Sequence, residues 1–158
     1  MSEHDRNHLE KLGGAAHLLI TNSDHVRDSQ NLVESTGARC WGPVAEKGSF
    51  PVSCDEWLGE GDQPLPGLRV FAMEGSKTPG ELALLLENTT LITGDLIRAH
   101  EGGRLCMLPE AKLQDRHAAI TSVKRMASLK DIETVLPGDG WPVFSKGAEA
   151  LKQIVDRL

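Results

Sequence analysis

Four short polar clusters in this sequence contain residue types that can do chemistry, and each follows an apolar run. They are 21–25 (TNSDH), 75–80 (GSKTPG), 93–95 (TGD) and 136–140 (LPGDG). Their carboxylates and amides can ligate a metal ion, move a proton or pair with a cation. The same residue types are preferred in turns and at helix N-termini, so each cluster alone is more often a cap or a turn. Only the four clusters together favour a shared site.

The elements that would position these clusters follow from hydrophobic periodicity. We expect strands at 16–21, 38–41, 68–73, 82–86, 89–93 and 132–136, and helices at 3–12, 26–35, 111–129 and 145–158. The strands at 82–86 and 89–93 should form an antiparallel hairpin. Segments 42–66 and 98–109 are expected as loops, with one amphipathic turn near Trp57 in the first, and Ser145 as the cap of the last helix. This order of elements predicts one α/β layered domain, in which sites gather at strand ends.

The sequence around the clusters resembles the metallo-β-lactamase superfamily. That family carries T-H-x-H-x-D-H, P-G-H-T-P-G, T-G-D-L and P-G-H-G motifs in this order. This chain has LLITNSDHVRD, GSKTPGEL, LITGDLI and VLPGDGWPV, and the resemblance extends from about Ala16 to the C-terminus. It implies an αββα sandwich formed by a single domain over residues 1–158. The family's usual first strands are missing before Ala16, so we expect a fold shortened at the N-terminus.

The resemblance does not extend to the family's metal ligands. The seven family positions, aligned without gaps, hold Asn22, Asp24, Val26, Arg27, Lys77, Asp95 and Asp139, and only Asp95 keeps the family residue. Zinc prefers histidine and cysteine ligands, and a charged ammonium or guanidinium does not bind a metal ion. We therefore expect no bound metal and no other cofactor. Asp24, Asp95 and Asp139 should instead pair with Lys77 and Arg27.

Several functions remain open for this remodelled site. The first is a site without metal that binds a small molecule, or an interaction domain. The second is a hydrolase of an ester, thioester, lactone or phosphoester that uses one oxygen-ligated ion such as Mg²⁺, Mn²⁺ or Ca²⁺. A third is catalysis by Lys77 itself, which neighbouring carboxylates disfavour because they keep the amine protonated. A structural or regulatory fragment that gains order only with a partner is a further alternative.

These functions share one set of candidate residues, although the sequence leaves open whether the chain is an enzyme. The catalytic candidates are Asp95, Lys77 and Asp24. The binding candidates are Asn22, Arg27, Asp139 and Trp141, the last because it directly follows the 136–140 turn. His25 lies between the family's ligand positions, and we expect it to have a local role in the turn rather than a chemical one.

Composition limits the partners. The formal net charge of −6 disfavours nucleic acid, and no apolar run approaches the roughly 20 residues of a membrane span. The three cysteines form no C-x-x-C pair, so we expect them to be reduced and to pack as buried small hydrophobic side chains. Reduced cysteines are typical of a cytoplasmic protein, which we therefore expect. If the first strands are missing, a sheet edge is left open, which predicts a possible homodimer.

Overall fold

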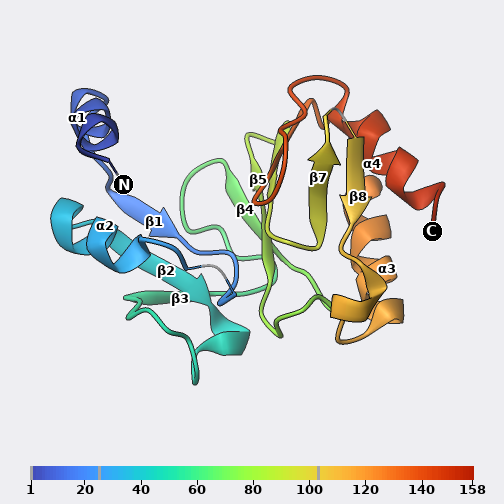
Figure 1. Cartoon of the computed structure of the whole chain (residues 1–158), viewed down its shortest axis with the longest axis horizontal. Coiled ribbons are helices and arrows are strands. Elements are labelled where there is room, and N and C mark those ends of the chain that lie inside the picture. The colour runs from blue at the N-terminus through green and yellow to red at the C-terminus, as the bar shows by residue number, and fades with distance from the viewer. Residues whose placement is uncertain (1, 25, 103) are drawn as a thin grey trace.

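The computed structural model describes residues 2–24, 26–102 and 104–158, which form two packed sheets and an additional hairpin (Figure 1). The N-terminal sheet is parallel and has the order β1 (His17–Leu19), β2 (Arg39–Pro43) and β3 (Glu56–Leu58). The second sheet has the order β4 (Leu68–Ala72), β5 (Leu82–Leu86), β6 (Thr90–Thr93) and β9 (Thr134–Pro137). Its first three strands are antiparallel, as the expected 82–93 hairpin requires, and β6 and β9 are parallel.

The helices lie on two opposite sides of the pair of sheets (Figure 1). They are α1 (Glu3–Lys11), α2 (Ser29–Thr36), α3 (Arg116–Ala127) and α4 (Gly147–Val155), together with short 3₁₀ turns at η1 (Val44–Glu46) and η2 (Glu110–Lys112). Figure 1 shows α1 and α2 on the side of β1–β3, and α3 and α4 on the opposite side of the molecule. None of the helices in the described part of the chain has the length and apolar character needed to cross a membrane.

Three hydrophobic clusters correspond to the spaces between these layers. The inner cluster joins the facing surfaces of the two sheets and includes Leu58, Val70 and Leu84, with Leu19 and Trp41 packed against it. The largest cluster lies between the second sheet and helices α3 and α4, and contains twenty buried residues. The outer cluster between the N-terminal sheet and α2 has only Ile20, Cys40 and Val52 as buried members. The layers are therefore α, β, β and α, as the resemblance predicts.

Two predicted loops are wrong because they contain strands. Residues 98–109 contain most of a hairpin formed by β7 (Ile97–Glu101) and β8 (Arg104–Met107). In the sequence the charged Arg98 lies between the apolar Ile97 and Ala99, which is the two-residue alternation typical of a strand, and all three residues are buried in the structure. Segment 42–66 contains β3, which is too short to give a clear pattern by sequence.

The predicted start of the last helix is also wrong. Helix α4 begins at Gly147 after Lys146, whose backbone is left-handed with φ 58°, and Ser145 precedes this cap. The backbone N–H groups of Gly147 and Ala148 donate to carbonyls of Glu133 and Ile132. These bonds to the segment before β9 determine where the helix starts, and no side-chain cap does so.

The polar clusters converge because strands of both sheets end at the same edge. The backbone N–H of Leu82, at the start of β5, donates to the carbonyl of Thr21 after β1 at 2.8 Å. The backbone N–H of Gly138, after β9, donates to the carbonyl of Thr93 at the end of β6 at 2.8 Å. These bonds join the ends of β1, β6 and β9 and the start of β5 into one polar edge of the sandwich.

Candidate charge-pair site at the strand ends

Lys77 lies at the centre of this edge. Its ammonium contacts the carboxylate of Asp24 and lies 3.2 Å from Oδ2 of Asp95. The Asp95 side chain is only 7% exposed and that of Lys77 is 18% exposed. We call Asp24, Lys77 and Asp95 the Lys77 cluster. The structure thus brings together the three residues that the sequence singled out as catalytic candidates.

The ammonium of Lys77 is held in its charged form. Burial alone would lower the pKa of Lys77, but the hydrogen bonds and charges of Asp24 and Asp95 outweigh burial and raise this pKa above its usual value. A protonated amine has no free lone pair for a proton or an electrophile. The Lys77 cluster therefore acts as a fixed charge centre, and a role for Lys77 as base or nucleophile has no support.

Asn22 holds the two aspartates in place. Its side-chain nitrogen lies 3.5 Å from Oδ2 of Asp95, and its side-chain oxygen accepts the backbone N–H of Asp24 at 3.1 Å. Asn22 is 5% exposed. The buried amide of Asn22, which follows β1, therefore positions both aspartates of the Lys77 cluster through its hydrogen bonds.

Glu81 is a buried acid behind this cluster that the sequence analysis missed. Its Oε2 accepts the hydroxyl of Ser76 at 2.5 Å, and its Oε1 accepts the backbone N–H of Leu96 at 2.7 Å. Burial raises the pKa of Glu81 to about 7, an increase that Asp95 reinforces and these hydrogen bonds oppose. The sequence carries one signal for this residue. Glu81 stands directly before the apolar 82–85 run, so it lies at the start of a buried strand.

Gly94 allows Glu81 and Asn22 to approach the turn between them. A Cβ at this position would lie 2.9 Å from Oε1 of Glu81 and 3.0 Å from Nδ2 of Asn22. Both contacts are closer than real Cβ atoms tolerate without a shift of the neighbours. The glycine of the TGD motif therefore leaves room for these two side chains beneath Asp95.

A cavity of about 260 Å³ opens beside the cluster. Arg27 is its cationic residue, and this guanidinium donates to the carbonyl of Gly138 at 3.1 Å. The predicted pairing of Arg27 with an aspartate is therefore wrong, and its partner is a backbone carbonyl. The lining residues are Thr21, Asn22, Arg27, Gly94, Asp95 and Gly138.

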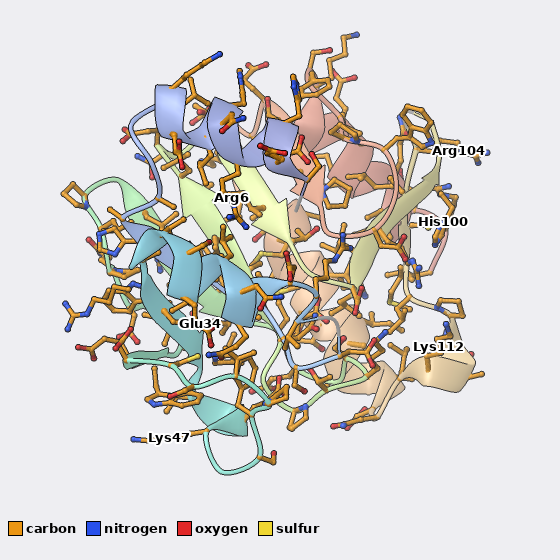
Figure 2. The ribbon with its side chains drawn as sticks, turned by 60° about the vertical axis from the view of Figure 1, so that its left-hand side comes forward. Arg6, Glu34, Lys47, His100, Arg104 and Lys112 are labelled. Carbon is orange, nitrogen blue, oxygen red and sulfur yellow. The ribbon has the colours of Figure 1, made fainter. Side chains whose placement is uncertain are left out.

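Asp139 belongs to a second cluster, the Arg98 cluster, which we define as Arg98, His100 and Asp139. The guanidinium of Arg98 contacts the carboxylate of Asp139, and Nε2 of His100 lies 3.5 Å from it. The predicted pairing of Asp139 with Lys77 or Arg27 is wrong, because the backbone N–H of Ala99 donates to the Asp139 carbonyl at 2.9 Å and holds this residue beside β7. Figure 2 shows His100 and Arg104 extending from the β7–β8 hairpin at the edge of the molecule.

Trp141 lies outside the cavity lining. Its side chain is largely exposed, and its backbone N–H donates to the carbonyl of Ala99 at 2.7 Å. The 136–140 turn is thus attached to β7 on both sides of Gly140. His25, for which we expect a local role in the turn, lies outside the described residues.

The described residues do not fit the metal centre that the family implies. No group of three or more His, Cys, Asp or Glu side chains suited to a metal ion is present among them. The two carboxylates that do converge, Asp24 and Asp95, face the ammonium of Lys77, and Asp139 faces Arg98. A divalent ion at this point would be repelled by the ammonium that now contacts both carboxylates.

The comparisons with known proteins agree with this fold. The sequence profile of the metallo-beta-lactamase superfamily matches residues 1–158, and the chain belongs to that superfamily. No matching sequence was found among curated proteins.

Solved structures share the fold at low sequence identity. A structure of TTHA1623 in a di-iron-bound form is 21% identical, with a TM-score of 0.76 over 99% of this chain and 84% of that chain. A metallo-beta-lactamase from Pontibacter korlensis is 14% identical, with a TM-score of 0.74 over 98% of this chain and 74% of that chain. One from Erythrobacter litoralis, with beta mercaptoethanol in its active site, is 18% identical, with a TM-score of 0.70 over 95% and 72%. At these identities the likeness shows the fold alone.

Proposed function

We propose that this chain is a metallo-β-lactamase-fold protein that binds a small molecule at the strand-end cavity without a catalytic metal. The observation that carries the proposal is the ammonium of Lys77 in contact with Asp24 and Asp95. At this point the family places a divalent cation between its motif ligands. An ammonium supplies positive charge there but offers no lone pair and no open coordination position.

Arg27 gives the cavity a cation that can bind an anionic group. Asp95, the carboxylate of the lining, faces the ammonium of Lys77, which it shares with Asp24, whereas Arg27 lines the cavity with a backbone carbonyl as its partner. A guanidinium binds carboxylate or phosphate through two parallel hydrogen bonds. We therefore assign Arg27 and Asn22 to ligand binding and the Lys77 cluster to the charge balance of the site.

Titration with simple probes tests this function. Elemental analysis of the purified protein should find no stoichiometric zinc, iron or manganese. Inorganic phosphate or acetate should raise the melting temperature, and Arg27→Gln should remove that rise. Arg116→Gln is the matched control, because Arg116 pairs with Glu110 on the surface away from the cavity lining. A full equivalent of bound metal, or an equal anion response in both variants, would contradict the proposal.

A second candidate function, a hydrolase with one oxygen-ligated ion, is favoured by the convergence of two carboxylates on one point. The similar fold of a di-iron-bound protein makes this candidate worth testing. Mn²⁺ or Mg²⁺ should then raise the melting temperature, EDTA should reverse the rise, and Asp95→Ala should abolish ester or phosphoester hydrolysis. Absence of any metal effect on the wild-type melting temperature would exclude this candidate.

A further inference from the structure

Cys40 and Cys54 are in direct contact, although they are fourteen positions apart. Their Sγ atoms lie 3.3 Å from each other. Cys40, on β2, is fully buried, and Cys54, just before β3, is partly exposed. A disulfide has an S–S distance of about 2.05 Å, so the two sulfurs need only a small approach to bond.

The backbone around the two cysteines is already fixed. The side chain of Asp55 accepts the backbone N–H of Cys40 at 2.8 Å, and the carbonyl of Cys40 accepts the backbone N–H of Asp55 at 2.9 Å. This reciprocal pair holds β2 against the residue that follows Cys54. Gly42 provides the space for the second sulfur, since a Cβ there would lie 2.9 Å from Sγ of Cys54. Bond formation therefore requires side-chain rotation and no rearrangement of strands.

We propose that Cys40 and Cys54 form a reversible intramolecular disulfide when the protein meets a hydroperoxide. The third cysteine, Cys106, lies on β8 in the other half of the molecule and is not part of the pair. This inference is independent of the ligand proposed for the strand-end cavity.

The oxidation of the two cysteines proceeds in two steps. The Cys54 sulfur, as the thiolate, attacks one peroxide oxygen, the O–O bond breaks, and the other oxygen leaves and takes up a proton as an alcohol or water. This gives the sulfenic acid of Cys54. The Cys40 sulfur then attacks Sγ of Cys54, the S–O bond breaks, and the hydroxyl group leaves with the Cys40 proton as water. Both sulfurs are oxidised and the peroxide is reduced. A dithiol reductant reverses the change by thiol–disulfide exchange.

The environment of Cys54 sets the pH dependence of the first step. Burial, followed by the hydrogen bond and charge of Cys40, raises the pKa of Cys54 to about 12. The reactive thiolate is therefore scarce at neutral pH, and its fraction grows about tenfold for each pH unit below this pKa. We expect oxidation to be slow at pH 7 and to become about a hundredfold faster at pH 9.

The disulfide would strengthen a weak part of the fold. Among the described residues, the outer cluster that contains Cys40 has three buried members and five partly buried ones, so less apolar burial holds β2, α2 and the 44–55 segment together than holds the twenty-residue cluster. A disulfide between Cys40 and Cys54 closes the loop between these positions and restricts the unfolded chain. In a protein of this length we therefore expect the melting temperature to rise by roughly 5 °C or more.

The experiment oxidises the whole protein with hydrogen peroxide and follows it by intact mass and non-reducing peptide mapping. The Cys106→Ser variant should lose the mass of two hydrogen atoms, yield one peptide pair linked through Cys40 and Cys54, and melt at a higher temperature until a dithiol is added. Cys54→Ser should show no such loss. If wild type and Cys106→Ser instead give only sulfinic acids, intermolecular dimers or unreacted thiols at pH 9, the proposal is overturned. Mapping of the wild type gives the answer even if a variant fails to fold.

Discussion

The Lys77 cluster and the Arg98 cluster both pair a cation with aspartate at the ends of strands, but they differ in the burial of Asp95 compared with Asp139 and in connectivity. Lys77 bridges two carboxylates from different elements, one of them only 7% exposed. Arg98 contacts one carboxylate, that of Asp139, which is 37% exposed and has His100 nearby. The first cluster joins loops from both sheets, whereas the second attaches the turn after β9 to the β7–β8 hairpin.

The difference shows what a buried carboxylate requires. A buried charge is costly unless an opposite charge and hydrogen bonds satisfy it. Asp95, the one residue that matches the family's ligand pattern, remains buried and has Lys77 as its counter-ion. Asp139 is partly exposed to water and depends less on its partner. We therefore expect the Lys77 cluster to govern stability and the Arg98 cluster to tune the position of a surface turn.

The largest expected effect comes from removing Lys77. Lys77→Met keeps much of the side-chain length but leaves the Asp95 carboxylate buried without a cation, which should cost about 3–5 kcal/mol in the free energy of unfolding. Urea denaturation followed by circular dichroism measures this loss. The double variant Lys77→Met/Asp95→Asn should recover part of it, because the uncompensated charge is gone. A double variant no more stable than Lys77→Met would show that the cost is one of packing.

The next effect is a pH dependence that comes from Glu81. Its pKa of about 7 lies above the usual value of 4.5, so the folded state binds the proton more tightly than the unfolded state. The contribution of Glu81 is therefore fully present below pH 4.5 and is lost as pH rises through 7, by at most about 3 kcal/mol. Glu81→Gln mimics the protonated acid and should remove this dependence. The measurement is the difference in unfolding free energy between wild type and variant from pH 5 to pH 8, and a constant difference would contradict the assignment.

Sequence patterns were sufficient for the layers and for the convergence of Asp24, Lys77 and Asp95. Long apolar runs identified the buried strands, and the four motifs provided the relative placement of residues far apart in the chain. The sequence does not predict the partner of Asp139, because Arg98 lies in the 98–109 segment that is expected as a loop. The alternation at Ile97, Arg98 and Ala99, with Gly102-Gly103 after it, is a hairpin signal that was available.

Other features depend on tertiary contacts that periodicity does not encode. Glu81 precedes an apolar strand and looks like a turn residue, yet backbone and hydroxyl donors from two other segments surround it. The contact between Cys40 and Cys54 depends on β3, which has three residues and no clear pattern. In both cases the decisive neighbours lie in segments whose structure the sequence left open.

Removing Arg98 should have a smaller effect than removing Lys77. Arg98→Met breaks the pair with Asp139, but that carboxylate is partly exposed and regains water, so the cost should be about 1 kcal/mol. The loss should also shrink at high salt, because solvent ions reach the partly exposed carboxylate of Asp139 more easily than the buried one of Asp95. Urea denaturation at low salt and at about 1 M salt measures both quantities. A loss as large as that of Lys77→Met would mean that the two clusters are equivalent.

The smallest effect should come from His100, which tests whether the Arg98 cluster behaves as a network or as a single pair. His100 is 56% exposed and lies 3.5 Å from a carboxylate that already contacts Arg98, so His100→Gln should change the free energy of unfolding by less than about 0.5 kcal/mol. In the Arg98→Met background Asp139 keeps His100 as its ion-pair candidate among the described residues. If the three residues form a network, the loss of unfolding free energy caused by His100→Gln should be larger in the Arg98→Met background than in the wild type. The difference should exceed roughly 0.5 kcal/mol, because the effects of independent substitutions add to within that amount. Equal costs in both backgrounds would reduce the cluster to the single pair of Arg98 and Asp139.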